Sequence, residues 1–510
     1  MIPRRDRRTG DGSNAVTQAL DGGDQLVELG IGELVGVDVE ERIDRHSQII
    51  EPLRHGKSIA QAYENHIKIE QKFVPNLNNF ERPPAREGGG VSSGSTGMAR
   101  LRIRDRTPVI AVLVALSFVA AACGSSTAID GASSPPTVAA AEPKAAELVR
   151  IEPSPPDVTM SGIEIFRGEE IAGAPEPLVD LDHIRSGGPP PDGIPSIDDP
   201  VLIAASDVDF LEENEPVLAL SINGEARAYP VQIMTWHEIV NDTVGGVPVA
   251  VTYCPLCNSA LVYDRRLNDR VLEFGTSGLL LNSSLVMYDR QTETLWSHFT
   301  GGGIVGELTG EELETFPTAT VSWSAWLDAN PDGLVLSRDT GFDRSYGQNP
   351  YPGYDDVNSQ PFLFDGETDG RYTAMTRIVG VERDGDALGV PLSSLREAGV
   401  IVAGLGDTDL VVLWTPGTAS SLDSFDIAAG TDVGATGVFE PIADGQALTF
   451  SADQDGSGQT FTDTQTGSVW NVLGQAIEGP LAGAQLEAVP HVDTFWFAWS
   501  AFQPESAIIE

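Results

Sequence analysis

The sequence predicts a β-rich α+β protein made of two tandem, internally duplicated domains with mostly antiparallel strands. Two turn pairs flanked by alternating apolar residues, Asn223-Gly224 and Asp384-Gly385, predict a β-hairpin in each half of the chain. A second pair of similar segments, residues 289–296 and 463–470, begins with aspartate and ends with tryptophan in both halves. The halves are therefore related at a spacing of roughly 170 residues, which is too long for a solenoid repeat.

The composition and the charge restrict the class of protein. Of the 510 residues 41% are hydrophobic, and 54 are glycine and 34 proline, which is typical of a globular protein with many turns. Residues 1–123 hold equal numbers of basic and acidic side chains, so the net charge of −44 lies on residues 124–510. Such a surface repels nucleic acids and anionic lipid head groups, and we expect no nucleic-acid partner.

The first part of the chain has the features of an export signal. Residues 1–97 are polar and weakly periodic, so we expect a disordered segment outside the mature protein, with translation starting at Met98. Residues 98–123 combine several arginines, an apolar run of about 14 residues and small residues at the end, which is the pattern of a signal peptide. The final Ala120-Ala121-Ala122-Cys123 resembles a bacterial lipobox, which implies cleavage before Cys123 and a lipid on its thiol.

This signal predicts a location outside the cytoplasm. We expect an exported protein held at the cell envelope by the lipid on Cys123, with residues 124–157 as an Ala/Pro/Ser-rich tether. The alternative is a membrane anchor with a cytoplasmic tail, but the apolar run is too short to span a bilayer comfortably. Beyond the tether we expect the first domain at residues 158–340, an inter-domain loop at 341–375 and the second copy at 376–510.

The first domain is expected to place a cysteine pair between two strands. A hairpin at residues 217–230 precedes a short helix, predicted at 231–240. The segment Thr252-Tyr253-Cys254-Pro255-Leu256-Cys257 follows an apolar run at 247–251. Strands are further expected at 259–263, 272–274, 284–289 and 294–298, and a closing helix at 322–330.

The second copy lacks the cysteines. Its residues 378–391 match the first hairpin, but Thr415-Pro416-Gly417-Thr418 stands where the first copy has Cys254-Pro255-Leu256-Cys257. No histidine lies opposite His237 either. Because the frame is kept while these side chains are lost, we interpret the two thiols and His237 as functional. The second copy is then a degenerate partner that covers or braces the first.

Four segments of the first domain carry a family resemblance. They are residues 236–242 (WHEIVND), 252–257 (TYCPLC), 274–278 (FGTSG) and 287–296 (MYDRQTETLW). Together they resemble the bacterial and archaeal domain-of-unknown-function family 3179 (DUF3179), over residues 200–340 and more weakly over the second copy. The family name implies no established activity and assigns no catalytic residue. His298 departs from the family pattern, in which glutamine is more usual, so we do not count it among the expected ligands.

The first functional hypothesis is a metal centre. Cys254 and Cys257 can bind one ion, and His237 would complete a Cys₂His ligand set. A nearby thioether from Met287 would favour copper over zinc, although Met287 also fits a place in the core. The residues expected to support the site are Glu238, Ser277 and Asn282.

Two other hypotheses stay open for the same cysteines. One is a thiol–disulfide redox couple, in which His237 lowers the pKa of a thiol and the exported location permits oxidation. Redox pairs normally open a helix, whereas this pair lies between two strands. The other is a structural role in a non-catalytic envelope binding or scaffold protein. The sequence names neither a substrate nor a partner protein, and it does not decide whether the protein is an enzyme.

Overall fold

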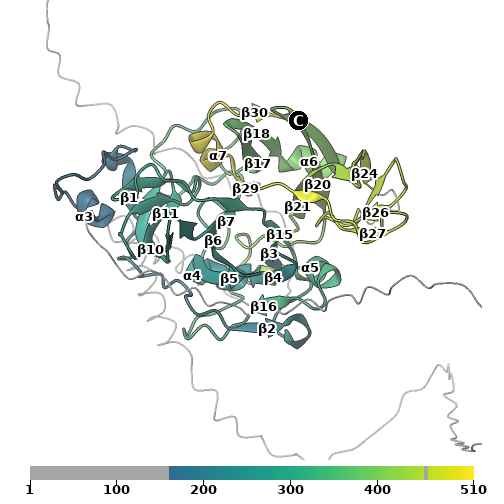
Figure 1. Cartoon of the computed structure of the whole chain (residues 1–510), viewed down its shortest axis with the longest axis horizontal. Helices are drawn as coiled ribbons and strands as arrows, with labels where there is room; N and C mark the ends of the chain where they lie inside the picture. Colours follow the sequence, from purple (N-terminus) through teal and green to yellow (C-terminus); the bar gives the residue numbers. More distant parts are fainter. Residues whose placement is uncertain (1–159, 453–457, 510) are drawn as a thin grey trace, which may run out of the picture. The chain divides into compact units, whose positions relative to one another are not determined.

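The computed structural model describes residues 160–452 and 458–509, which form mainly antiparallel sheets (Figure 1). Strands hold 40% and helices 12% of the described residues, so the predicted β-rich α+β class is confirmed. The signal peptide, Cys123 and the tether were predicted on residues that lie outside the described ranges. Within those ranges, no helix is both long and apolar enough to cross a membrane.

The first predicted hairpin is present and belongs to a five-stranded sheet. Asn223 and Gly224 have φ angles of 52° and 82°, the left-handed values that a two-residue hairpin turn requires. The strand order is β15-β3-β4-β16-β2, in which β4 and β16 are parallel and the other neighbours antiparallel. The strands are β2 (Leu202–Ala204), β3 (Pro216–Ile222), β4 (Glu225–Pro230), β15 (Ala319–Ser322) and β16 (Leu334–Leu336).

The helix after this hairpin is shorter than predicted. Helix α4 spans Val231–His237 and not residues 231–240, because Glu238 adopts a φ of 60° and ends it. Strand β5 therefore begins at once and joins a second sheet of order β14-β7-β6-β5, in which all neighbours are antiparallel. The strands are β5 (Ile239–Val244), β6 (Val247–Cys254), β7 (Ser259–Asp264) and β14 (Thr315–Phe316).

A third sheet, of order β1-β10-β11-β12-β13, completes the first half. The strand predicted at 272–274 is shifted, because β10 starts only at Phe274, whereas the strand predicted at 284–289 is confirmed. The strands are β1 (Ile184–Ser186), β10 (Phe274–Leu281), β11 (Ser284–Asp289), β12 (Leu295–Ser297) and β13 (Gly303–Val305). The remaining elements are α3 (Gly162–Phe166), η1 (Leu181–His183), η2 (Ala205–Asp207), β8 (Arg266–Leu267), β9 (Arg270–Val271) and α5 (Trp323–Ala329).

The second half has the same order of elements. Its sheets β29-β17-β18-β30, β19-β20-β21-β28 and β24-β25-β26-β27 correspond in turn to the three sheets of the first half. The duplication itself stays a prediction. The strands are β17 (Arg377–Arg383), β18 (Asp386–Pro391), β19 (Val400–Leu405), β20 (Thr408–Thr415), β21 (Ala435–Glu440), β22 (Ile442–Ala443), β23 (Gln446–Ala447), β24 (Phe450–Ala452), β25 (Phe461–Asp463), β26 (Val469–Trp470), β27 (Ala476–Glu478), β28 (Glu487–Ala488), β29 (Val492–Phe495) and β30 (Ala507–Ile508). The helices are α6 (Leu392–Ala398), η3 (Ile427–Ala429) and α7 (Trp496–Phe502).

The two halves share their hydrophobic cores. One buried cluster contains both cysteines of the first half together with residues 495–499 of the second. Another joins Trp323 and Trp326 to Phe461 and Trp470. Strand β29 packs against β7, and β15 packs against β21, so the two halves meet at two strand–strand contacts, although no sheet of the described residues contains strands of both halves (Figure 1). The cysteine turn therefore lies where the halves meet.

Each half contains a buried aspartate that organises a turn. The carboxylate of Asp289 accepts hydrogen bonds from the backbone N–H and the hydroxyl of Thr292 and, at 2.9 Å, from Trp296 Nε1. Asp463 accepts the matching bond from Trp470 Nε1 at 3.0 Å. Both aspartates are 0% exposed. The paired Asp–Trp segments seen in the sequence are therefore architectural.

We expect Asp289→Ala to lower the free energy of unfolding by about 2–4 kcal/mol, because it leaves several buried donors without an acceptor. The midpoint of chemical denaturation measures this change. The matched control is Asp269→Ala, which alters an exposed carboxylate and should stay within about 0.5 kcal/mol of the unchanged protein. Equal midpoints for the two variants would contradict the role of Asp289.

Candidate metal centre

The cysteine pair lies in a tight turn between two paired strands. Cys254 ends β6, and Ser259, its register partner, begins β7. The turn is closed by a hydrogen bond from the backbone N–H of Asn258 to Pro255 O at 3.2 Å, with Asn258 at a φ of 52°. Both cysteines are free thiols and buried, at 1% and 0% exposed. The strand–turn–strand setting expected from the sequence is confirmed.

A histidine completes the group, but it is not the predicted one. One ligand atom each from Cys254, Cys257 and His298 lie within 4.8 Å of one another, and all three residues are buried. His298 follows β12 directly, and its backbone is fixed by a hydrogen bond from its N–H to Leu285 O at 3.1 Å. Its carbonyl accepts a bond from Tyr263 Oη at 2.6 Å. The structure therefore places His298, which the sequence analysis did not count as a ligand, beside the thiols.

The His298 ring has an unusual hydrogen-bond environment. Its Nδ1 lies 3.5 Å from Ser259 Oγ, and its Nε2 is buried with no partner among the described residues. Burial lowers the pKa of His298 to about 4, so the imidazole is neutral near pH 7. A neutral imidazole with an unpaired buried nitrogen is the form in which histidine binds metal ions.

The two thiols differ in acidity. Burial and the neighbouring Cys257 raise the pKa of Cys254. Burial also opposes ionisation of Cys257, but hydrogen bonds with the Cys254 thiol, Ser259 and Ser284 outweigh it and lower the pKa of Cys257. The Sγ of Cys257 lies 2.9 Å from Ser259 Oγ and 3.5 Å from Ser284 Oγ. Cys257 is therefore the thiol that ionises first.

Glu238 lies close to the thiols but outside the group of ligand atoms. It is 8% exposed, and burial followed by the proximity of Cys254 raises the pKa of its carboxyl well above the usual value. Its backbone carbonyl accepts a hydrogen bond from Tyr253 N at 2.8 Å, which ties the end of α4 to β6. The carboxyl group of Glu238 therefore resists ionisation beside Cys254.

His237 makes other contacts. Its Nδ1 lies 2.7 Å from Pro195 O and its Nε2 lies 2.6 Å from Tyr346 Oη, so both ring nitrogens are engaged. It is not in the group that could hold a metal ion. The reason is local: α4 ends one residue later at the positive φ of Glu238, and the His237 ring packs toward residues 342 and 346 instead.

The other predicted site residues have structural partners. Ser277 Oγ donates to Val286 O across β10 and β11, and Asn282, at a φ of 50°, forms the turn between these strands. Met287 is buried in the same hydrophobic cluster as the two cysteines. Ser277 and Asn282 therefore shape the sheet beside the centre, and neither joins its ligand atoms.

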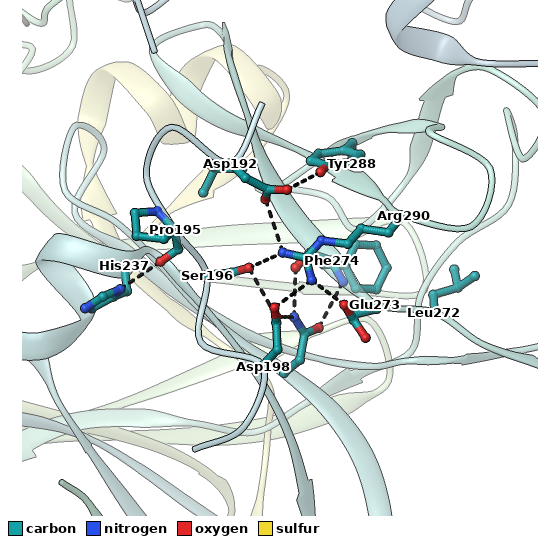
Figure 2. A network of polar contacts seen from close by, with 12 residues as sticks. Asp192, Pro195, Ser196, Asp198, His237, Leu272, Glu273, Phe274, Tyr288 and Arg290 are labelled. Atoms are coloured by element: carbon teal, nitrogen blue, oxygen red, sulfur yellow. Dashed lines mark hydrogen bonds and ion pairs between the residues drawn. The ribbon is translucent and has the colours of Figure 1, made fainter. Parts of the chain in front are cut away.

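Residues 192–198, a loop that precedes the first hairpin, are fixed by an ionic network that the sequence analysis missed. Arg290 binds Asp198 at 2.8 Å, Asp192 at 3.2 Å and Glu273 (Figure 2). Asn241 Nδ2 donates to Asp198 and to Phe274 O, both at 2.8 Å. This network holds residues 192–198 against β10 and β11, and so places Pro195 beside His237 (Figure 2). The sequence feature that could have indicated this network is Arg290 itself, which lies next to Asp289 in the family motif at residues 287–296.

The inter-domain segment and the second half cover the turn. Tyr354 Oη donates to Leu256 O at 2.9 Å, and Ser283 Oγ donates to Phe362 O. From the second half, Thr494 Oγ1 donates to Cys257 O at 2.8 Å and Phe495 N donates to the same oxygen at 3.2 Å. The turn is therefore enclosed by residues far away in the sequence.

Taken together, the fold and this site define a β-rich α+β protein with a buried Cys/Cys/His group. The chain belongs to a family described as protein of unknown function (DUF3179), whose sequence model matches residues 191–506. This match confirms the family predicted from the motifs. No curated protein and no solved structure matches the chain.

The burial of His237 predicts acid sensitivity. Burial lowers the pKa of His237, and the charge of Arg344 lowers it further, although Pro195 O opposes the shift. Below about pH 6.5 the unfolded chain then binds a proton that the folded chain does not, so the free energy of unfolding falls as the pH drops. One proton contributes a slope of at most about 1.4 kcal/mol per pH unit.

We expect His237→Gln, which keeps donor and acceptor groups, to remove this part of the slope between pH 7.5 and 5.5, as measured by denaturant unfolding. His183→Gln changes an exposed histidine and serves as the control. A slope unchanged by His237→Gln would show that this histidine is not held neutral in the folded protein.

Proposed function

We propose that the protein binds one soft metal ion, copper(I) in preference to zinc(II), through Cys254, Cys257 and His298. The observation that carries this proposal is the buried Nε2 of His298, which has no hydrogen-bond partner among the described residues. Leaving such an atom unpaired is unfavourable, and a metal ion would satisfy it. A metal-bound histidine usually donates its other N–H to a nearby group, and Ser259 is available for this at Nδ1.

The softness and charge of the donors favour copper(I). The group offers three ligands, which excludes a closed four-ligand structural zinc site but would also suit an open zinc site, and Glu238 is not part of it. Thiolates are the ligands that select copper(I). Because the pKa of Cys257 is lowered and that of Cys254 is raised, Cys257 is the thiol that would bind as a thiolate, and one thiolate beside a neutral imidazole would balance a single positive charge. Zinc(II) would leave an uncompensated charge in a buried site unless Cys254 also ionised.

A thiol–disulfide couple is the second candidate. The unequal pKa values of Cys254 and Cys257 favour it, because redox pairs commonly combine one acidic and one less acidic thiol. Burial argues against it, since exchange requires a partner thiol to reach a sulfur that is almost fully covered. We therefore rank it below metal binding.

The location follows from the sequence and belongs to the same proposal. We infer that the chain is exported and held at the envelope by a lipid on Cys123. An extracytoplasmic protein with a closed thiolate–imidazole site would hold or transfer copper outside the cytoplasm. The proposal assigns no reaction to the site.

Elemental analysis of the full chain, purified without chelator and then offered copper(I) or zinc(II), tests the metal. We expect about one equivalent of copper per chain, and none in the Cys254→Ser/Cys257→Ser double variant. His298→Ala should weaken binding by more than the ~10–100-fold typical of an outer-shell change. His237→Gln is the matched control and should keep the metal.

The results have distinct meanings. Loss of copper in His237→Gln with retention in His298→Ala would overturn the ligand assignment. Preferential binding of zinc would overturn the choice of metal. If neither ion binds, the reduction potential of the Cys254–Cys257 pair becomes the test. A potential far outside the range of cellular thiol couples would then leave a non-catalytic binding or scaffold role.

The lipid is tested separately. We expect the protein, expressed in a bacterium, to sediment with membranes, and Cys123→Ser to release it into the soluble fraction, because the acyl chains supply the membrane affinity. Metabolic labelling with a fatty acid should mark the unchanged protein only. Labelled Cys123→Ser protein, or membrane association that survives the substitution without label, would contradict lipidation at Cys123.

A further inference from the structure

A second candidate site lies between the two halves, on the other side of β6 from the thiols. A cavity there is lined by Tyr253 and Asn258 from the first half and by Arg377, Thr418 and Asp493 from the second. The cavity encloses about 540 Å³, but this volume includes space that is open to solvent. The room available to the centre of a water molecule is only about 40 Å³. Because successive side chains of a strand point to opposite faces, Tyr253 faces this cavity while Cys254 belongs to the metal centre.

One residue that lines the cavity has a buried hydroxyl without a hydrogen-bond partner among the described residues. Thr418 is 1% exposed, and its Oγ1 has no hydrogen-bond partner within the described part of the chain. A buried polar group without a partner is rare in folded proteins, and it commonly marks the place of a missing water, ion or ligand. Thr418 occupies the position where the first half has Cys257, so the second half has a hydroxyl where the first has a thiol.

An arginine and an aspartate also line the cavity. Arg377 forms an ion pair with Asp355 through Nη2 at 2.8 Å, and the same nitrogen donates to Ser420 Oγ at 2.8 Å. Its Nε and Nη1 have no hydrogen-bond partner among the described residues. Asp493 accepts from Thr436 Oγ1 at 2.8 Å and forms no direct ion pair in the described ranges. Arg377 therefore has further N–H donors beside its ion pair with Asp355. Asp493, which has no direct ion pair among the described residues but interacts electrostatically with Arg377 and His491, faces the same small space.

A ligand that complements both Arg377 and Asp493 is a small molecule with one negative and one positive group. A carboxylate on its own would meet Arg377 but leave Asp493 without a direct ion pair, and an ammonium on its own would pair with Asp493 but leave the remaining N–H donors of Arg377 unused. A molecule with both groups on neighbouring atoms satisfies both, and the Thr418 hydroxyl supplies a third contact. The limited volume restricts the ligand to a few heavy atoms.

We propose that this cavity binds a small zwitterion, namely a free α-amino acid of the size of glycine, alanine or serine. The proposal goes beyond metal binding and does not depend on it, because the cavity and the thiols lie on opposite faces of β6. The two sites share only the turn, where Thr494 lines the cavity and its hydroxyl holds Cys257 O.

Isothermal titration of the full chain with glycine, L-alanine and L-serine tests the proposal. Acetate and methylammonium, each carrying half of the zwitterion, serve as comparison probes. We expect at least one of the amino acids to bind, and to bind at least ~10-fold more tightly than either half. Equal affinity for acetate would show an anion site, and absence of binding by all three amino acids would overturn the proposal.

Two variants locate the binding. Asp493→Asn keeps an acceptor for Thr436 but removes the charge, and it should weaken amino-acid binding at least ~10-fold while leaving acetate binding the same or stronger. Thr418→Val removes the unpaired hydroxyl at nearly constant shape, and it should weaken binding while leaving the melting temperature of the ligand-free protein unchanged or higher. Thr464→Val, an exposed position outside the cavity, is the control.

Metal content separates this proposal from the previous one. Both cavity variants should bind copper as the unchanged protein does, and the Cys254→Ser/Cys257→Ser variant should still bind the amino acid. Amino-acid binding that is lost only with the thiols, or that survives both cavity variants, would place the ligand elsewhere and overturn the assignment.

Discussion

The backbone carbonyl of Cys257 joins the two halves of this protein. It accepts one hydrogen bond from Thr494 Oγ1 at 2.8 Å and one from Phe495 N at 3.2 Å, both on β29 of the second half. A buried carbonyl needs such partners, because leaving it unpaired is costly. The position of the thiol turn therefore depends on a strand more than two hundred residues later in the chain. The first half alone would lack this support for the turn.

Burial at this junction determines the chemistry on both faces of β6. On one face, burial lowers the pKa of His298 and raises that of the Glu238 carboxyl, while hydrogen bonds with hydroxyls favour ionisation of Cys257. A site of this kind suits a soft ion of low charge. On the other face, the second half supplies Arg377 and Asp493, which line a cavity. In the predicted duplication, the first half carries thiols where the second half carries a hydroxyl, Thr418.

Several sequence motifs that could have been functional have structural roles instead. Asp289 and Trp296 close a buried turn, and Asn241 and Arg290 fix the loop that carries Pro195. His237 is held by that loop and by Tyr346, which removes it from the thiols. A family motif can therefore be specific because it builds the frame that positions a site, and the ligands themselves need not all lie within it.

The sequence by itself determined the hairpins at Asn223 and Asp384, the strand–turn–strand setting of the cysteines, and the family. These depend on local rules: left-handed turn residues, alternation along strands, and a short motif. Only the tertiary structure decided that His298 and not His237 lies beside the thiols, and that a polar cavity backs the same strand. The physical reason is that helix α4 ends at the positive φ of Glu238, while the pairing of β11 with β12 carries His298 to the turn. Neither a chain reversal of this kind nor a contact between halves can be read from spacing along the chain.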